Sequence, residues 1–385
     1  MEIILFEDEK YPNFYPISCL RSLGEIMTGR WTQKERVERW FGKSPLIYSM
    51  RAEYGDKIDY QKDNLFLNAR LKEFKGLADI KSGSKVINKD DEVLAYRSDR
   101  MLSKREFEGL NTIQKENPLY EFIWDIIGDL ENRLVHDLEG DPDLSQIQSP
   151  LDESIYIEDP KRIFIGSEVK IERGVIFNTQ GGPIWIDNRV LIRGNTVIDG
   201  PAYIGEGCQI KPGSFLSNIG IGRVTKLSGE VEDSIFQGYA NKQHFGFLGH
   251  SFIGEWINLG AGTTNSDLKN NYRPVKVIIE DKTYQTNMQF LGLLIGDHSK
   301  TAVNTSFNTG SIIGPFCNIF SQGFPPKYLP PFTWWGGDLS EYKLNKAIET
   351  ARKVMKRRNI EMDAQYERKI RKLFCETKNL RKNRE

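Results

Sequence analysis

Aliphatic side chains recur every six residues through much of the second half of the chain. The longest unbroken run comprises Ile186, Ile192, Ile198, Ile204, Ile210 and Leu216. A period of six matches neither the 3.6-residue repeat of an amphipathic helix nor the two-residue alternation of a half-buried strand. Six consecutive matches are hard to obtain by chance, so an antiparallel β-sandwich with accidental spacing is the weaker alternative.

A triangular solenoid accounts for this period. Each coil would consist of three short strands of about six residues, and each strand would turn one aliphatic side chain inward. Glycine often follows the repeat aliphatic, as in Ile204-Gly205 and Ile253-Gly254, and it suits a corner that a Cβ would resist. Hexapeptide repeats of this kind wind left-handed, against the usual right-handed crossover. The sequence therefore predicts a left-handed parallel β-helix over residues 151–330.

Two stretches interrupt the six-residue period. Asn218–Asn241 and Asn265–Gln289 lack the regularly spaced aliphatic residues. Insertions leave a solenoid at its corners and can overhang a neighbouring coil, and such loops frequently carry functional residues. Both stretches are therefore predicted to be loops that contribute to a site.

Residues 1–150 show a different pattern, in which short apolar runs alternate with segments of helical spacing. The expected strands are Ile3–Phe6, Leu65–Leu71 and Val86–Val93, and the expected helices lie within Thr32–Trp40 and Tyr120–His136. This alternation predicts an α/β, Rossmann-like layer domain with a mostly parallel sheet. Pro142–Pro150 is expected to link this domain to the solenoid.

Residues 331–385 are expected to form a basic helical tail, and Ser340–Glu385 shows no strand pattern. Between Ser340 and Glu385 there are 15 Lys and Arg residues against 7 Asp and Glu. A thin apolar stripe predicts one or two helices, packed on the end of the solenoid or across subunits. Because Lys plus Arg and Asp plus Glu balance at 53 each over the whole chain, a solvated basic face is favoured over a nucleic-acid site.

The cysteines and the apolar runs indicate the compartment. Cys19, Cys208, Cys317 and Cys375 lie far apart without a CxxC pair, which excludes a disulfide scaffold and a cysteine zinc site and fits a reducing cytoplasm. No apolar run approaches the roughly 18 residues of a membrane span, and Met1–Asp8 is too short and acidic for a signal peptide. A cytoplasmic protein without membrane partners is expected.

The most distinctive segment of the chain is Asn241–Gly262, which resumes the repeat. It contains His244, one of only four histidines, followed by Asn258 and then by Gly-Ala-Gly-Thr at 260–263. The spacing of these residues, with Gly249 and Gly254 between them, resembles the acetyltransferase half of the bifunctional N-acetylglucosamine-1-phosphate uridyltransferase/glucosamine-1-phosphate N-acetyltransferase family. Together with the repeats, the resemblance covers residues 160–330.

This resemblance implies acetyl transfer from acetyl-CoA to the amine of an amino-sugar phosphate. A base must take a proton from the attacking amine, and a neutral imidazole near pH 7 suits that role. The resemblance assigns this base to His244, sugar binding to Asn258, and a backbone N–H facing the thioester to Ala261, where it can steady the oxyanion. From the residues alone, a corner histidine bonded to backbone stays open as the alternative for His244.

Further assignments follow from the same resemblance. They are Lys211 and Lys226 for the phosphate group, Asp297 and Ser321 for CoA, and Asp267 for the substrate. Phe247 stands where the family has a tyrosine, so a hydroxyl near the sugar is lost. The segment after Gly-Ala-Gly-Thr also differs from that of the family. The identity of the acetyl acceptor therefore stays open.

The order of the two domains also resembles this enzyme, with a shortened front half. Arg21, Lys34 and Asn68 lie in the stretches LRSLGEIMTGRWTQKE and LFLNARL, which are similar to nucleotide-binding stretches of the family and imply uridylyl transfer that yields a UDP-sugar. The glycine-rich nucleotide loop is missing, and Glu7–Pro12 takes its place. Its carboxylates either hold Mg²⁺ or form a solvated turn. A catalytic front half and a non-catalytic one both stay open.

Two other classes of function stay open. Solenoid trimers of the γ-carbonic anhydrase type bind zinc through three histidines, for which His244, His250 and His298 are candidates, although two histidines six residues apart share one face rather than converge. A non-catalytic scaffold would bind no CoA. The favoured interpretation is a transferase that acts on sugar phosphates and nucleotides. A homotrimer is expected, because one face of a coil cannot enclose both a CoA and a sugar.

Overall fold

The computed structural model describes residues 1–59, 63–320 and 323–382. The chain folds into two compact units, Met1–Ile26 with Trp31–Asp125 and Met27–Arg30 with Ile126–Glu385. Residues 126–149 pack with the second unit, ahead of the boundary expected at residue 150.

The first unit is built on a six-stranded sheet of order β2-β1-β3-β5-β4-β6. Its strands are β1 (Ile3–Phe6), β2 (Leu46–Tyr48), β3 (Asn64–Asn68), β4 (Ser84–Ile87), β5 (Val93–Ser98) and β6 (Asn111–Gln114). β1 is parallel to β2 and β3, and β4 to β6, whereas β5 is antiparallel to β3 and β4. The α/β layer is confirmed, but the sheet is mixed rather than mostly parallel. Val86–Val93 is not a strand of its own, because it contains the turn between β4 and β5.

Helices α1 (Gln33–Phe41) and α2 (Lys104–Glu108) belong to this unit. α1 begins where the Thr32 hydroxyl accepts a hydrogen bond from the Glu35 N–H and the Glu35 carboxylate accepts one from the Thr32 N–H. On one face of the sheet the rings of Phe66 and Tyr96 stack at 4.4 Å, and Phe107 of α2 meets Tyr96 edge-on at 4.9 Å. This aromatic contact fixes α2 to the sheet.

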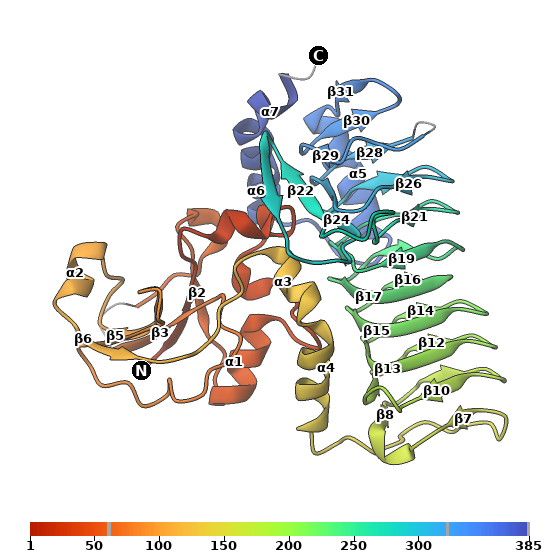
Figure 1. The fold of residues 1–385 in the computed structure, drawn as a ribbon, viewed down its shortest axis with the longest axis horizontal. Helices are drawn as coiled ribbons and strands as arrows, with labels where there is room; N and C mark the ends of the chain where they lie inside the picture. The colour runs from red at the N-terminus through yellow and green to blue at the C-terminus, as the bar shows by residue number, and fades with distance from the viewer. Residues whose placement is uncertain (60–62, 321–322, 383–385) are drawn as a thin grey trace. The chain divides into compact units, whose positions relative to one another are not determined.

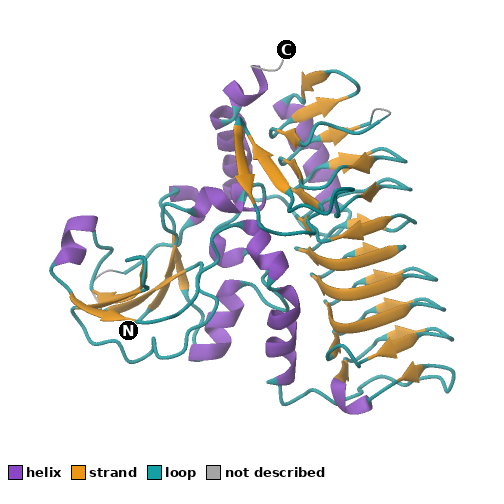
Figure 2. Cartoon of the chain, in the orientation of Figure 1, coloured by secondary structure: helices purple, strands orange, loops and turns teal. Residues whose placement is uncertain are grey.

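The second unit is a parallel β-solenoid whose coils stack strand upon strand (Figure 1). One sheet follows the order β29-β27-β24-β20-β17-β15-β13-β10-β7, and its longer strands β13, β15 and β17 extend round a corner of the coil. A second sheet follows β18-β16-β14-β12-β9. Figure 2 shows the short strands joined by loops at the corners. The strands are β7 (Tyr156–Ile157), β8 (Ile163–Ile165), β9 (Lys170–Ile171), β10 (Ile176–Asn178), β11 (Ile184–Ile186), β12 (Leu191–Ile192), β13 (Val197–Ile204), β14 (Gln209–Ile210), β15 (Phe215–Ile221), β16 (Lys226–Leu227), β17 (Glu230–Phe236), β18 (Asn241–Lys242), β19 (Phe247–Gly249), β20 (Phe252–Ile253), β21 (Thr264–Asn265), β24 (Leu293–Ile295), β25 (Lys300–Thr301), β26 (Ser306–Phe307), β27 (Ser311–Ile313), β28 (Asn318–Ile319), β29 (Tyr328–Leu329), β30 (Thr333–Trp335) and β31 (Leu339–Glu341).

The repeat aliphatics fill the interior of the solenoid, as the six-residue period predicted. Ile192, Ile210 and Leu227 are successive partners along one column of strands, and each is 0% exposed. Burying one such side chain stabilises a fold by about 1.5–3 kcal/mol. The stacked columns therefore supply the main stabilisation of this unit, and the predicted repeat architecture is confirmed.

The two interruptions of the period have different causes. Asn218–Asn241 does not leave the solenoid, so the prediction of a loop there is wrong. Leu216 pairs with Val231 in the next coil, whereas Ile198 pairs with Leu216, so this coil is three residues shorter than the one before. Asn265–Gln289 does leave the solenoid and contains an antiparallel hairpin of β22 (Lys276–Ile279) and β23 (Lys282–Gln285).

Pro142–Pro150 begins the solenoid instead of serving as a free linker. The N–H of Gln148 donates to the carbonyl of Ile165 at 2.7 Å, and the hydroxyl of Ser149 donates to the carbonyl of Gly166 at 2.6 Å. Helices α3 (Ile123–Gly128) and α4 (Leu130–Glu139) precede this segment. α4 packs along β13, β15 and β17.

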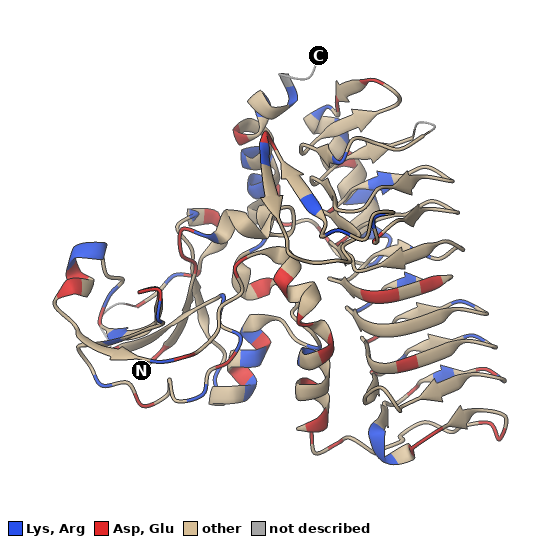
Figure 3. Ribbon diagram, in the orientation of Figure 1, with Lys and Arg blue, Asp and Glu red and all other residues tan. Residues whose placement is uncertain are grey.

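The solenoid continues past the boundary expected at residue 330, because β30 pairs with β28 and β31 pairs with β30. The tail then forms three helices where one or two were predicted: α5 (Leu344–Lys356), α6 (Ala364–Glu376) and α7 (Lys378–Lys382). Figure 3 shows basic residues recurring along α6. The tail packs on a column of corner aromatics whose rings stack from coil to coil and whose φ values lie between 52° and 62°: Tyr239, Trp256, His298, Phe316 and Phe332. The hydroxyl of Tyr366 in α6 bonds to Nε2 of His298 at 3.0 Å. Among the described residues, no helix is long and apolar enough to cross a membrane.

Replacing Ile210 by alanine should destabilise the solenoid by about 2–4 kcal/mol, because a fully buried side chain is removed and a cavity is left in the column. The matched control is Gln209→Ala, at the preceding, outward position of β14, which should change the free energy of unfolding by less than about 0.5 kcal/mol. Urea unfolding followed by circular dichroism measures both. Equal losses would show that the column does not carry the stability.

Candidate functional site

His244 lies at the corner that follows β18, and its side chain is exposed. Within the described residues the imidazole has no hydrogen-bonding partner, so it is not a corner histidine held by backbone bonds. Its carbonyl oxygen instead accepts a hydrogen bond from the Lys242 ammonium at 3.2 Å. The ring is therefore open to solvent and to a ligand, while its backbone is tied to the interior of the coil.

The Gly-Ala-Gly corner of the next coil packs directly against this corner. The N–H of Gly262 donates to the carbonyl of Phe245 at 3.2 Å. A Cβ on Gly246, whose φ is +127°, would lie 2.3 Å from the Thr263 carbonyl oxygen, so only glycine permits this approach. Within the described part of the chain, the backbone N–H of Ala261 donates no hydrogen bond. The structure thus brings the predicted base and the predicted oxyanion donor onto adjoining corners.

Asn258 stands on the outer side of the same coil. Its backbone pairs with Asn241 of the preceding coil and with Lys300 of the following coil. Asn241 pairs in turn with Lys226, one coil earlier. These four residues form an outward polar ladder across successive coils. The structure therefore brings Asn258 and Lys226, both predicted substrate ligands, onto one face of the solenoid.

A pocket of about 260 Å³ opens beside this ladder. The solenoid supplies one part of its lining and the end of α5 the other: Tyr239, Asn241, Trp256, Ile257, Asn258, Lys300, Val354, Arg357 and Arg358. The Arg358 guanidinium donates to the Asn241 side-chain oxygen at 3.4 Å. Sequence reasoning missed Lys300, Arg357 and Arg358, because no local pattern indicates where a tail helix docks.

Positive charge gathers at and beside the pocket, where Lys300, Arg357 and Arg358 belong to the lining. Burial lowers the pKa of Lys226, and the nearby charges of Arg358, Lys211 and Arg357 lower it further. Burial alone lowers the pKa of Lys300 to about 8. Among the described residues, none of these five cations forms an ion pair with a carboxylate. Their arrangement is suited to an anion.

The other predicted residues of the second unit lie elsewhere. Asp297 is 1% exposed, and its carboxylate accepts a hydrogen bond from the Glu255 N–H at 2.8 Å, so it supports a corner. Ser321 lies outside the described residues. Asp267 follows the Gly-Ala-Gly corner, at the start of the hairpin segment, and its Oδ2 lies 2.9 Å from Nδ1 of His250.

The zinc alternative gains no support from the three histidines. His250 lies between the carboxylates of Asp267 and Asp233, His298 bonds to Tyr366, and His244 is exposed. Within the described residues there is no group of three or more His, Cys, Asp or Glu side chains that could hold a metal ion.

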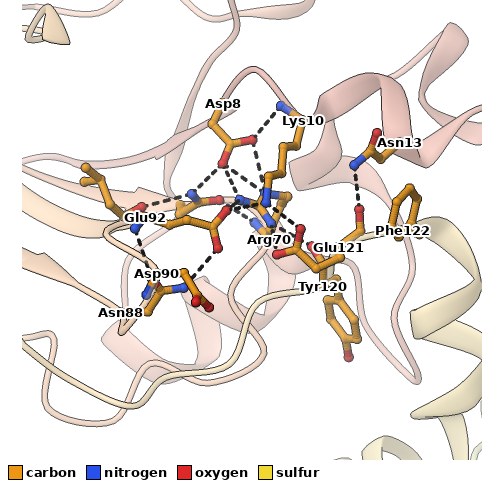
Figure 4. Close-up of polar contacts among 12 residues, drawn as sticks. Asp8, Lys10, Asn13, Arg70, Asn88, Asp90, Glu92, Tyr120, Glu121 and Phe122 are labelled. Atoms are coloured by element: carbon orange, nitrogen blue, oxygen red, sulfur yellow. Dashed lines mark hydrogen bonds and ion pairs between the residues drawn. The ribbon is translucent and has the colours of Figure 1, made fainter.

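In the first unit, charged residues after β1 and β3 form a closed network around Arg70, whose side chain is 1% exposed (Figure 4). Its guanidinium contacts Asp8 at 2.6 Å, Glu92 at 2.8 Å and Glu121 at 2.9 Å. Lys10 adds a second cation, 2.6 Å from both Glu92 and Glu121. The carboxylates of this network therefore surround the Arg70 guanidinium and are neutralised by it and by Lys10.

The carboxylates of Glu7–Pro12 are likewise already paired. Glu7 is 1% exposed and contacts Arg51 at 2.7 Å, so the expectation of a solvated turn is wrong for this residue. Glu9 pairs with Lys104 at 2.7 Å on the surface. With Asp8 held by Arg70, these side chains do not fit a Mg²⁺ site in the conformation described.

The predicted nucleotide-binding residues are mostly engaged by their own framework. Arg21 is 6% exposed and donates to the Ile17 carbonyl at 3.1 Å. Asn68 is 1% exposed, and its amide donates to Asp8 at 2.9 Å and to the Val93 carbonyl at 3.0 Å. Lys34 is half-buried on α1. Of the three, Lys34 alone belongs to no described ion pair or side-chain hydrogen bond.

Comparison with known proteins agrees with this architecture. Residues 3–140 match the family model described as sugar nucleotidyl transferase. The bifunctional sugar-1-phosphate nucleotidylyltransferase/acetyltransferase of Sulfurisphaera tokodaii is 34% identical over 151 residues, covering 35% of this chain and 37% of that protein. The bifunctional protein GlmU of Methanococcus aeolicus is 34% identical over 145 residues, covering 31% and 34%.

A longer match is the bifunctional protein GlmU of Buchnera aphidicola, which is 28% identical over 258 residues and covers 60% of this chain and 53% of that protein. The chain thus spans between about a third and about half of the length of these relatives. The resemblance that the motifs indicated is confirmed.

Arg70→Ala should destabilise the first unit by about 3 kcal/mol at pH 7, because three carboxylates lose the guanidinium that joins them. Arg100→Ala is the control, since Arg100 pairs with Glu106 on the exposed surface and its loss should leave stability nearly unchanged. Urea unfolding of the full chain measures both variants.

The effect should also depend on pH. Burial by itself raises the pKa of Glu92, but hydrogen bonds from Lys10, Asn88 and Arg70 lower it to about 2. The ordinary value is 4.5, so Glu92 stabilises the fold above that pH, and this contribution is lost as the pH falls towards 2. The difference in stability between the wild type and Arg70→Ala should narrow over that window. A difference independent of pH would contradict the network.

Proposed function

We propose that the second unit transfers an acetyl group from acetyl-CoA to the amine of a phosphorylated amino sugar, and that the first unit transfers a uridylyl group to the resulting N-acetyl sugar 1-phosphate, yielding a UDP-sugar. The observation that carries the proposal is the exposed imidazole of His244 beside the corner whose Ala261 N–H donates no hydrogen bond within the described residues. Base and oxyanion donor are the two groups that acyl transfer to an amine requires.

In the proposed reaction the amine nitrogen attacks the thioester carbonyl carbon. His244 accepts a proton from this nitrogen, and the Ala261 N–H stabilises the negative charge that develops on the carbonyl oxygen. The carbon–sulfur bond then breaks and CoA leaves as the thiol, taking up a proton. The products are the amide and CoA.

The pocket supports an anionic acceptor. A phosphate group would neutralise cations that otherwise repel one another: Arg357 and Arg358 line the pocket, and their charges, with that of Lys211, act on Lys226. Asn258 can donate and accept hydrogen bonds with sugar hydroxyls from the same pocket. We therefore propose Lys211 and Lys226 as phosphate ligands and Asn258 as a sugar ligand.

We propose that the active assembly is a homotrimer. His244 and Ala261 lie on corners, so a single solenoid encloses neither substrate, whereas a groove between neighbouring solenoids would. Closed threefold symmetry supplies three such grooves. Use of acetyl-CoA, cytoplasmic location and Mg²⁺ dependence of the first unit belong to the same proposal.

A second candidate is a single-function acetyltransferase with a non-catalytic first unit. It is favoured by the missing glycine-rich loop and by the engagement of Glu7 and Asp8 with Arg51 and Arg70. The match of residues 3–140 to a sugar nucleotidyl transferase model favours the bifunctional proposal.

His244→Ala should lower kcat for acetyl transfer by at least about 10²-fold, the usual weight of a general base. Release of free CoA thiol from acetyl-CoA and glucosamine 1-phosphate measures the rate. Gln243→Ala, at the neighbouring position, is the control and should retain wild-type kcat. An active His244→Ala variant would exclude the base role, and absence of CoA binding to the wild type would leave a scaffold.

For the first unit, pyrophosphate release from UTP and N-acetylglucosamine 1-phosphate should be observed in the presence of Mg²⁺. Lys34→Ala should raise KM for UTP by about tenfold, the cost of one charge-assisted contact to phosphate. Lys43→Ala is the matched control, because Lys43 pairs with Glu2 on the surface. Lack of turnover by the wild type with any nucleotide would favour the single-function candidate.

A further inference from the structure

Lys242 occupies a position where the solenoid otherwise places an aliphatic side chain. It is the partner of Leu227 in the column that also contains Ile192 and Ile210, and it is 2% exposed. Lysine is almost never buried to this extent without a partner, because its ammonium loses its hydration. The position therefore requires a compensating set of contacts.

The compensation comes from three backbone carbonyls. The Lys242 ammonium donates hydrogen bonds to Ser228 at 2.8 Å, to His244 at 3.2 Å and to Gly246 at 2.6 Å. An ammonium has three N–H donors and no acceptor, so the three contacts use its full capacity. Burial lowers the pKa of Lys242 to about 8, and no charged side chain contributes to that shift.

These carbonyls belong to two stacked corners. Ser228 lies at the corner of the coil before, and His244 and Gly246 lie at the corner that carries the proposed base. A Cβ on Gly229, whose φ is +82°, would lie 2.7 Å from the Gly246 carbonyl oxygen, so the two corners meet too closely for a side chain at residue 229. An apolar residue at 242 would fill the column but leave three carbonyls without this donor, so the corner would lose the contacts that fix it.

We propose that Lys242 is a positioning residue for His244: from inside the solenoid, its ammonium holds the His244–Gly246 corner against the coil below and in register with the Ala261 corner above. The last link is the hydrogen bond from the Gly262 N–H to the Phe245 carbonyl, at 3.2 Å. This inference rests on the proposed role of His244 as the base. A base displaced by about 1 Å loses up to about 10²-fold in rate.

The test compares Lys242→Met with the wild type. Methionine has a similar length and suits a core position, so the fold is expected to persist while the corner loses its donor. We expect kcat for acetyl transfer to fall by about 10–100-fold with KM for acetyl-CoA within twofold. Leu227→Met, which places the same residue one coil earlier in the column, is the matched control and should keep kcat within twofold.

A pH profile separates positioning from general loss of stability. Below pH 8 the wild-type ammonium supplies three donors, and above it the neutral amine supplies two. The ratio of wild-type kcat to that of Lys242→Met should therefore be constant below about pH 8 and decrease above it. A ratio that stays constant up to pH 10, or a Lys242→Met variant with wild-type kcat, would overturn the proposal.

A measurement on the wild type keeps the inference testable if Lys242→Met does not fold. The chain has only four histidines, so the ring carbon signal of His244 can be assigned by its loss in His244→Ala. We expect that signal to shift near pH 8, as Lys242 titrates. Absence of a shift there would overturn the positioning role, whereas an active His244→Ala variant would overturn the proposed base and leave the structural link intact.

Discussion

The rest of the second unit depends on the continuous column of inward aliphatic side chains. Ile192, Ile210 and Leu227 are partners in successive coils and are fully buried. Parallel pairing keeps the register constant from coil to coil, so a residue outside the column meets its counterparts directly above and below. Asn258 therefore lies between Asn241 and Lys300. The ladder of polar groups at the pocket is a consequence of the packing inside.

The corners are the part of each coil that the column leaves free to vary. One column of corners carries aromatic residues such as Trp256 and Phe316, whose rings stack and are covered by the tail. Another carries Gly246 and Gly262, which let two corners approach until backbone contacts backbone. Aromatic corners thus bind the tail, and glycine corners hold His244 beside the next coil. The corners that the tail covers are therefore different from the corners that hold His244.

The sequence predicted those features that recur along the chain or lie within one short motif. The six-residue period predicted the column, and the motif that contains His244 and Asn258 predicted residues that the structure brings to adjoining coils. Lys242 escaped notice because its partners are backbone carbonyls, which no side-chain pattern displays. Arg358 escaped because the docking of a tail helix is set by long-range packing. The resemblance predicts Asp297 beside CoA, and its hydrogen bond from the Glu255 N–H joins two coils that are far apart in sequence, so no local pattern predicts that contact.

The charged residues of the first unit are paired with opposite charges, whereas several cations of the second unit lie near one another, and this difference affects what each unit can bind. In the first unit Arg70 is surrounded by Asp8 and Glu92, so the network is neutralised from within and offers little to an incoming phosphate. In the second unit Lys226 and Arg358 are held near each other by the solenoid and α5, with no described carboxylate between them. Like charges in a partly buried site repel. The fold holds these like charges together at a cost in free energy, which the phosphate of the proposed acceptor would relieve.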